Sequence, residues 1–175
     1  MAEIFTNSFT RAAGIVTSSS NASFAAAATT ITGISTTNIQ VGSLVDNLHF
    51  IGGTKVTAVG TGEVTVDRPS TNTSTVTGTI VSFLGVTTSY VATNKSVLIG
   101  GTLSNLTQGQ IEATIQVASG STAYNLLYSV PVPAGSSLVV SDAGKTLLQP
   151  GDRINLAVNA NNGADLSLSI LDGVN

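Results

Sequence analysis

The chain has 175 residues, a formal net charge of −3 and 9% charged residues, against roughly 25% in an ordinary soluble domain. Its 6 Lys and Arg residues argue against electrostatic nucleic-acid binding, which needs a basic patch, and the absence of Cys excludes disulfides and Cys-based metal sites. Hydrophobic residues make up 42% of the chain, which argues against disorder. Ser, Thr, Asn and Gly take the place of charged residues, a composition that suits repetitive extracellular or particle-borne β proteins better than cytosolic enzymes.

Residues 1–21 are predicted to form an N-terminal arm. Ile4, Phe5 and Phe9 alternate loosely with polar residues, and 18–21 indicates a flexible break. Two interpretations stay open. Chain ends commonly fray, but these apolar residues would be poor choices for a solvated tail, which favours an arm that docks on a neighbouring subunit.

Residues 22–88 are predicted to form a small β-rich module. The Gly60-Thr61-Gly62 turn lies between two short alternating segments and predicts a hairpin. An Ala run near Phe24 could form a helical turn, but it ends in β-branched residues and therefore favours a strand. The strands expected in this module cover 24–30, 39–45, 54–59, 63–66 and 76–84.

Residues 89–175 are predicted to form an antiparallel β-sandwich of the jelly-roll or Ig-like type, which makes the fold class all-β. Apolar and polar residues alternate with a period of two, as in strands with one buried face. Turns at Pro131–Gly135 and Gln149–Asp152 separate the segments. The expected strands cover 111–117, 124–132, 137–140, 154–158 and 166–171, preceded by short strands at 86–91 and 96–99.

Two parts of the chain resemble modules of phage proteins. The run from Ile31 to Val66, with Gly53-Thr54-Lys55-Val56-Thr57 at its centre, resembles small β modules of tailed-phage virion proteins. The run from Tyr124 to Leu171, with Pro131-Val132-Pro133-Ala134-Gly135, is similar to a β-sandwich unit in structural proteins of tailed phages, cyanophages in particular. The resemblance implies a non-enzymatic particle component and carries over no functional residue.

Candidate catalytic residues have simpler explanations in this sequence. His49 is the single His and lacks the spacing of a metal motif, so we interpret it as a hydrogen-bonded loop or core residue. Gly60–Glu63 lacks the Lys and the following helix of a phosphate loop. Tyr90, Tyr124 and Tyr128 are expected to pack in the core. The Asn-x-Ser/Thr sequons begin at Asn21, Asn72, Asn94 and Asn105 and are expected by chance.

The nine acidic residues are scattered and form no paired-carboxylate or calcium-loop pattern. Several of them occupy turn contexts, where Asp bonds to the local backbone. They are Glu3, Asp46, Glu63, Asp67, Glu112, Asp142, Asp152, Asp165 and Asp172. We therefore predict no catalytic, cofactor-binding or metal-ligating residues, and no enzyme.

The leading functional hypothesis is a phage virion structural protein, most of all a capsid decoration (cement) protein that stabilises the particle through β-mediated contacts. The alternatives are a neck or tail fibre component and a glycan- or receptor-binding module at a fibre tip; a small glycan hydrolase is disfavoured. No secretory signal or transmembrane helix is expected, so the protein would reach the virion by assembly in the host cytoplasm. The expected partners are the major capsid protein or neck and tail proteins, and copies of the chain itself as a homo-oligomer, with a trimer as the guessed symmetry; no nucleic acid or membrane partner is expected.

Overall fold

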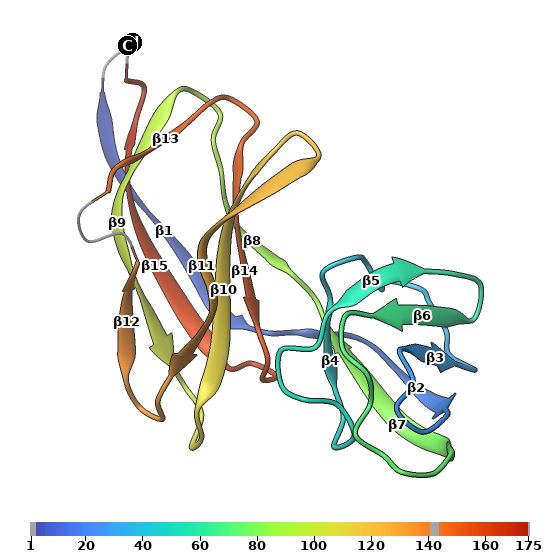
Figure 1. Ribbon diagram of the computed structural model, residues 1–175. Coiled ribbons are helices and arrows are strands. Elements are labelled where there is room, and N and C mark those ends of the chain that lie inside the picture. Colours follow the sequence, from blue (N-terminus) through green and yellow to red (C-terminus); the bar gives the residue numbers. More distant parts are fainter. Residues whose placement is uncertain (1–2, 141–143, 175) are drawn as a thin grey trace.

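A computed structural model describes residues 3–140 and 144–174, in which every regular element is a β-strand. This confirms the all-β fold class expected from the sequence. The chain forms two lobes, a larger β-sandwich and a smaller lobe built from β2 to β7 (Figure 1). The described residues contain no helix long and apolar enough to cross a membrane.

Two antiparallel sheets make up the sandwich. The first, which we call the β1 sheet, has the order β1-β15-β9-β12, with β13 also paired to β9; the second, the β8 sheet, has the order β11-β10-β14-β8. The strands of the β1 sheet are β1 (Ile4–Ala13), β15 (Ala164–Asp172), β9 (Ser96–Asn105), β12 (Ser137–Val140) and β13 (Thr146–Leu148). Those of the β8 sheet are β11 (Thr122–Val132), β10 (Ile111–Ser119), β14 (Arg153–Val158) and β8 (Thr87–Val91).

The strand order identifies the sandwich as a jelly roll. When its strands are counted from one to eight along the chain, with β12 and β13 sharing the sixth position, the sheets have the orders 1-8-3-6 and 2-7-4-5. In this arrangement the first and last strands pair, and the chain wraps from both ends toward a central hairpin, here β10 and β11. Of the two sandwich types that the sequence leaves open, the structure has the jelly roll.

Every second side chain of the sandwich strands points into the space between the two sheets. In β15, Leu166, Leu168 and Ile170 are buried, while the Ser residues between them face outward. In β10, Ile115 is fully buried and its neighbour Gln116 is half-exposed. Each such strand contributes every second side chain to one continuous apolar core.

The smaller lobe is a closed barrel. Its strands have the order β4-β7-β2-β3-β6-β5, and backbone hydrogen bonds between 42–45 and 54–56 join β4 to β5 and close the ring. Phe24, Phe50 and Phe83 are buried in its core. The strands are β2 (Val16–Phe24), β3 (Thr30–Thr32), β4 (Leu44–Asp46), β5 (Val56–Val59), β6 (Glu63–Val66) and β7 (Val76–Leu84).

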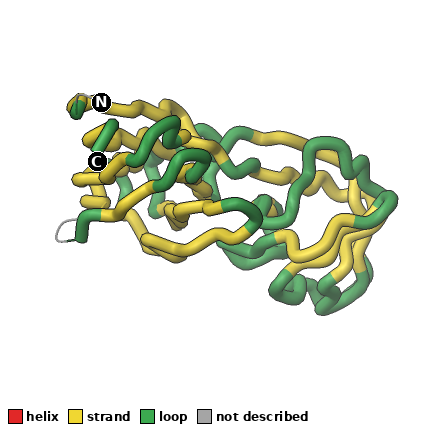
Figure 2. Tube along the Cα trace, turned by 90° about the horizontal axis from the view of Figure 1, so that it is seen from above, coloured by secondary structure: helices red, strands yellow, loops and turns green. Residues whose placement is uncertain are grey.

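The structure divides the chain differently from the three ranges drawn from the sequence. Residues 4–13 of the expected arm form β1, which pairs along β15, and 16–24 form β2 of the barrel, so 18–21 is not a flexible break. The barrel is therefore an insertion between the first and second strands of the jelly roll. Figures 1 and 2 show it far from the end of the sandwich where Ile4 pairs with Asp172.

Two of the expected barrel strands are largely turns. The expected strand at 24–30 is broken after Phe24, and Ala27 takes a positive φ of 51° in the tight turn between β2 and β3. The expected strand at 39–45 contributes only its last two residues, Leu44 and Val45, to β4. In both segments the chain turns sharply between short strands of the barrel, so Ala25–Ala27 and Val41 are exposed, whereas Ile39 is buried.

Candidate interaction surface

The strand β1 carries its aromatic residues on the solvent side of the sandwich. Phe5 is 63% exposed and Phe9 75% exposed. Between them, Thr6 and Ser8 are half-buried and Asn7 is exposed, as the alternation of a strand requires. On the inner side the strand is polar, and the Ser8 hydroxyl donates a hydrogen bond of 2.6 Å to the Ser89 carbonyl oxygen of β8. Leaving a Phe exposed forgoes about 1.5–3 kcal/mol of burial energy, so these two residues contribute little to the folding of this chain.

Cross-strand neighbours extend this apolar character across the β1 sheet. Phe5 lies opposite Leu171, and Leu171 opposite Val97, which in turn faces Leu147 of β13. Leu147 is 49% exposed. We call the solvent side of the β1 sheet the outer face; its large apolar residues are Phe5, Phe9, Val97, Val139, Leu147 and Leu171.

A second row of cross-strand neighbours, parallel to the one from Phe5 to Leu147, is polar at its centre. Phe9 lies opposite Ser167, which faces Thr102, and Thr102 faces Val139, which is 57% exposed. Exposed apolar groups at both edges of a sheet, with hydroxyls between them, form a surface that can pack against another protein and still hydrogen-bond it. Only the row from Phe5 to Leu147 is contiguous, and contiguous exposed apolar groups mark interaction sites in soluble proteins.

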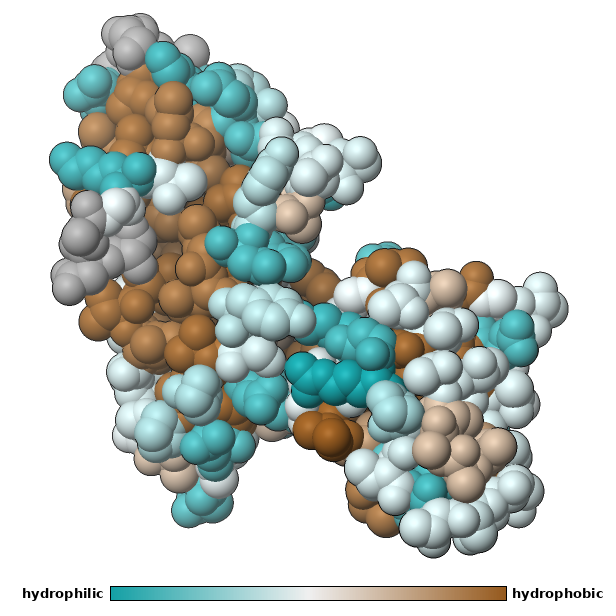
Figure 3. Space-filling model, viewed as in Figure 1, coloured by the Kyte–Doolittle hydropathy of each residue, from teal (hydrophilic) through white to brown (hydrophobic). Residues whose placement is uncertain are grey.

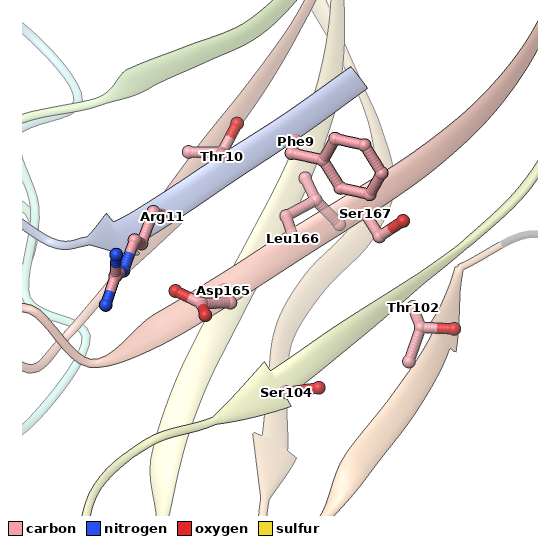
Figure 4. A pocket seen from close by; sticks show the side chains of 8 residues that line it. All are labelled: Phe9, Thr10, Arg11, Thr102, Ser104, Asp165, Leu166 and Ser167. Carbon is pink, nitrogen blue, oxygen red and sulfur yellow. The ribbon is translucent and has the colours of Figure 1, made fainter. Parts of the chain in front are cut away.

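A hollow of about 330 Å³ lies at the β1 end of the outer face. Figure 4 shows Phe9 and Arg11 of β1 on one side of it and Asp165 of β15 beside them. The Asp165 carboxylate accepts a 2.7 Å hydrogen bond from the Ala12 backbone N–H, which holds the bulge where β1 leaves the sheet. The hydroxyls of Thr102, Ser104 and Ser167 are also part of its lining.

A second concavity lies where the barrel meets the β8 sheet. Its volume is about 210 Å³, and its lining includes Lys55 of the barrel with Gln116 and Asn155 of the sandwich. The Lys55 ammonium lies 3.8 Å from the centroid of the Tyr128 ring, a cation–π contact across the two lobes. The Gln116 amide donates to Asn125 at 2.8 Å, so the amides are held in place along the sheet.

The single histidine has a packing role. Its ring lies edge-on to Phe24 with centroids 5.8 Å apart, and its backbone N–H bonds to the side chain of Asn47 at 2.9 Å. His49 is half-buried beside the barrel core. The geometry agrees with the interpretation of His49 as a loop or core residue.

Carboxylates accept hydrogen bonds from backbone N–H and hydroxyl groups, several of which lie far away in the sequence. Asp152 accepts the Gln149 N–H at 2.8 Å in the turn before β14, and Asp67 accepts the Lys55 N–H at 2.8 Å. Asp172 accepts the Ser96 hydroxyl at 2.8 Å. Asp142 lies outside the described residues. Within the described ranges, no three His, Cys, Asp or Glu residues lie close enough together to hold a metal ion.

The tyrosines differ from their expected place in the core. Tyr90 packs partly against the sandwich core, but Tyr124 is 62% exposed and Tyr128 52% exposed, so the core interpretation is wrong for these two. Both lie on β11, at the edge of the β8 sheet. The sequence signal that could have shown this is the irregular alternation from Tyr124 to Val130, which the structure explains by register shifts between β10 and β11.

Comparison with known proteins leaves the chain without a family. No family model and no curated protein matches it. Among solved structures, VP17, a capsid protein of bacteriophage P23-77, is similar at 15% identity over 94% of this chain and 82% of that chain, with a TM-score of 0.20. At that score and identity, the similarity decides neither the fold nor the function.

Proposed function

We propose that the protein is a structural component of a phage particle, and specifically a capsid decoration (cement) protein that stabilises the particle through β-mediated subunit contacts. The observation that carries the proposal is the outer face, with Phe5 and Phe9 more than half exposed. The jelly-roll topology supports it, because viral capsid domains use this fold, although lectins and cupins use it too. The protein would assemble into the virion in the host cytoplasm.

The two lobes suggest how such a subunit is oriented. Figure 3 shows hydrophobic residues gathered over the sandwich, whereas most of the visible surface of the barrel belongs to neutral or hydrophilic residues. The sandwich would therefore contact the particle, and the barrel would project into solvent. A specific interface typically buries about 1,600 Å², which a sheet face can supply without charged anchors.

The partners proposed are other virion proteins, namely the major capsid protein or neck and tail proteins, and further copies of the chain. The outer face carries few charges, so association with it would depend on packing and hydrogen bonds and respond weakly to salt. The trimeric symmetry guessed from the sequence has no supporting observation among the described residues.

Binding to isolated particles tests this proposal. Val139→Asp and Leu147→Asp place a charge on the outer face at positions remote from β1, while Leu48→Asp does the same on the barrel, where Leu48 is 82% exposed. We expect wild type and Leu48→Asp to co-sediment with particles and raise their melting temperature, and both outer-face variants to lose both effects. Equal binding by all variants, or no binding by wild type, would contradict the proposal.

The concavity between the lobes favours a second candidate function, the binding of a host glycan by a fibre-tip or surface module. Its volume of about 210 Å³ is below the roughly 300–1,000 Å³ of pockets for drug-sized ligands and suits a single sugar ring. Gln40, Gln116 and Asn155 provide amides for sugar hydroxyls, and Val41 and Val86 provide apolar contacts for its C–H groups.

Saturation-transfer NMR with free monosaccharides tests this second function. If it is correct, one or more sugars will show transfer that Asn155→Ala abolishes and Ser169→Ala, on the opposite side of the sandwich, leaves unchanged. The cement function predicts no transfer for any sugar.

A further inference from the structure

The first strand leaves one edge of the β1 sheet open. β1 pairs with β15 along its length and is the terminal strand of its sheet, so its other edge has no strand partner among the described residues. The strand is 10 residues long, contains no Pro, and Arg11 is its single charged residue. Natural proteins usually protect such an edge with short strands, Pro or inward-pointing charges because it can pair with another chain.

Two copies of this strand placed antiparallel bring matching residues opposite each other. Phe5 and Phe9 are equally far from Asn7, and so are Glu3 and Arg11, one acidic and one basic. All five are exposed and lie at odd positions, which in an extended strand places them on one face. In an antiparallel pair of two such strands centred on Asn7, each Phe5 faces a Phe9, and each Glu3 faces an Arg11.

We propose that β1 pairs antiparallel with β1 of a second copy of the chain, with the two Asn7 residues opposite each other on the two-fold axis. The pairing joins the β1 sheets of two sandwiches into one continuous sheet. This pairing gives the homo-oligomer of the proposed function a definite geometry. Only its biological role rests on the proposed function, because the complementarity lies in the residues of β1 themselves.

Each cross-strand pair in this register has a physical basis. Directly opposed residues bring their Cβ atoms to about 4.5–5.5 Å, close enough for the two Phe–Phe contacts. The side-chain oxygen Oδ1 of Asn7 accepts a hydrogen bond from the Ser169 hydroxyl at 3.2 Å, which holds the side-chain amide on the outer face, where its N–H groups can reach the second Asn7. Within the part of the chain that the structure describes, Glu3 and Arg11 make no ion pair of their own.

Other registers lose these pairs. Sliding the second strand by two residues places Asn7 opposite either Phe5 or Phe9 and separates the charges from each other. A parallel pair would place Glu3 against Glu3 and Arg11 against Arg11, and like charges directly opposite each other are destabilising. The antiparallel register centred on Asn7 is the arrangement that matches both the rings and the charges.

A single strand edge forms a small interface, below the roughly 1,200 Å² that marks weak and transient complexes. We therefore expect the free protein to dimerise at micromolar concentration and the dimer to be reinforced on the particle, where further contacts act together. An isologous contact of this kind produces a dimer and cannot by itself close a trimer.

Cysteine cross-linking tests the register directly, because the chain contains no Cys. Opposed residues in an antiparallel pair have Cα atoms about 4.5–5.5 Å apart, which lies within the range for a disulfide. Under mild oxidation, Asn7→Cys should form a covalent dimer, whereas Ser169→Cys, on the neighbouring strand β15, should form no covalent dimer. Phe5→Cys and Phe9→Cys should cross-link when mixed and much less when each is alone.

Charge reversal gives an independent readout by sedimentation equilibrium. Glu3→Arg and Arg11→Glu should each weaken the dimer by about tenfold, and the double variant should restore it, since reversing both charges re-forms the pairs. A monomer at all concentrations, a trimer, equal cross-linking of Ser169→Cys, or no restoration in the double variant would overturn the inference. Particle binding by the Val139 and Leu147 variants would still report on the proposed function separately.

Discussion

The two lobes solve the problem of the strand edge in opposite ways. The barrel closes on itself, because β4 and β5 join the two ends of its sheet, so its strands have their neighbours within the lobe. The sandwich ends its β1 sheet with a long, nearly uncharged strand and turns two Phe side chains outward. The same chain therefore closes one sheet and leaves another open, with exposed aromatic residues beside the open edge. Burial of apolar side chains within the chain does not account for this edge of the larger lobe.

The largest expected effect comes from separating the stabilities of the two lobes. Ile115 is fully buried between the sheets, so Ile115→Asp would bury a carboxylate without a partner and cost about 4 kcal/mol or more. Gln116→Asp, one residue later and facing outward, is the matched control and should cost under about 1 kcal/mol. Thermal melting followed by circular dichroism measures both; similar melting of the two variants would contradict the strand phase.

The same variant tests whether the barrel is an independent unit. β2 and β7 pair where the chain enters and leaves the barrel, at Val16 and Leu84, so the barrel closes without help from the sandwich. In Ile115→Asp, amide exchange at Val64 and Val81 should stay slow while exchange in β10 becomes fast. Simultaneous loss of protection in both lobes would show a single cooperative unit.

The connection between the lobes should be nearly as sensitive. Gly14 has a φ of 87°, and a Cβ added there would collide with the carbonyl oxygen of Ala160. We expect Gly14→Ala to destabilise the protein by about 3 kcal/mol, from left-handed strain and backbone displacement together. Gly135 has a φ of 62° with open space around an added Cβ, so Gly135→Ala should cost only about 1 kcal/mol. Equal denaturant midpoints for the two variants would refute this account.

A buried amide provides a smaller effect confined to the sandwich. The Asn105 side chain is 5% exposed and donates to the carbonyl oxygens of Gly109, Val132 and Pro133 at 2.8–3.0 Å. Asn105→Ala should cost about 2 kcal/mol, because these groups lose their donor. Asn94→Ala, at another sequon, is the control for a more exposed amide; urea unfolding of both variants should separate them by more than about 1 kcal/mol.

The smallest effect is expected where the lobes touch. Lys55→Met removes the cation over the Tyr128 ring and keeps most of the side-chain length, so it should cost about 0.5–1 kcal/mol. It should also loosen the lobes with respect to each other, which small-angle scattering would register as a broader distance distribution. An unchanged distribution would mean that the apolar contact among Leu44, Leu84 and Ala157 holds the lobes without it.

The sequence predicted the strands of the sandwich well because each has a clear inner and outer side. Residues 137–140 were predicted with the bounds that β12 has, and alternation in 166–171 identified the core side of β15. The barrel segments near Phe24 and Ile39 were not predictable in this way, because the chain turns where their apolar composition suggested an extended strand, and Ala25–Ala27 and Val41 are exposed in these turns. The pairing of β1 with β15 was also hidden, because it joins residues about 160 positions apart.

Part of the candidate surface could be inferred from sequence. Ile4, Phe5 and Phe9 stood out as unsuited to a solvated tail, and the structure places both Phe residues on the outer face. Val97, Val139 and Leu147 could not be identified, because an apolar residue in a short strand gives no sign of which face it occupies until the strand is paired.

A density map of the phage particle with this subunit in place tests the central claim most directly. Our account predicts that the sandwich lies against neighbouring subunits through its outer face, while the barrel projects outward with solvent around it. Density that seats the barrel in the particle and leaves Phe5, Phe9, Val139 and Leu147 bare would contradict it.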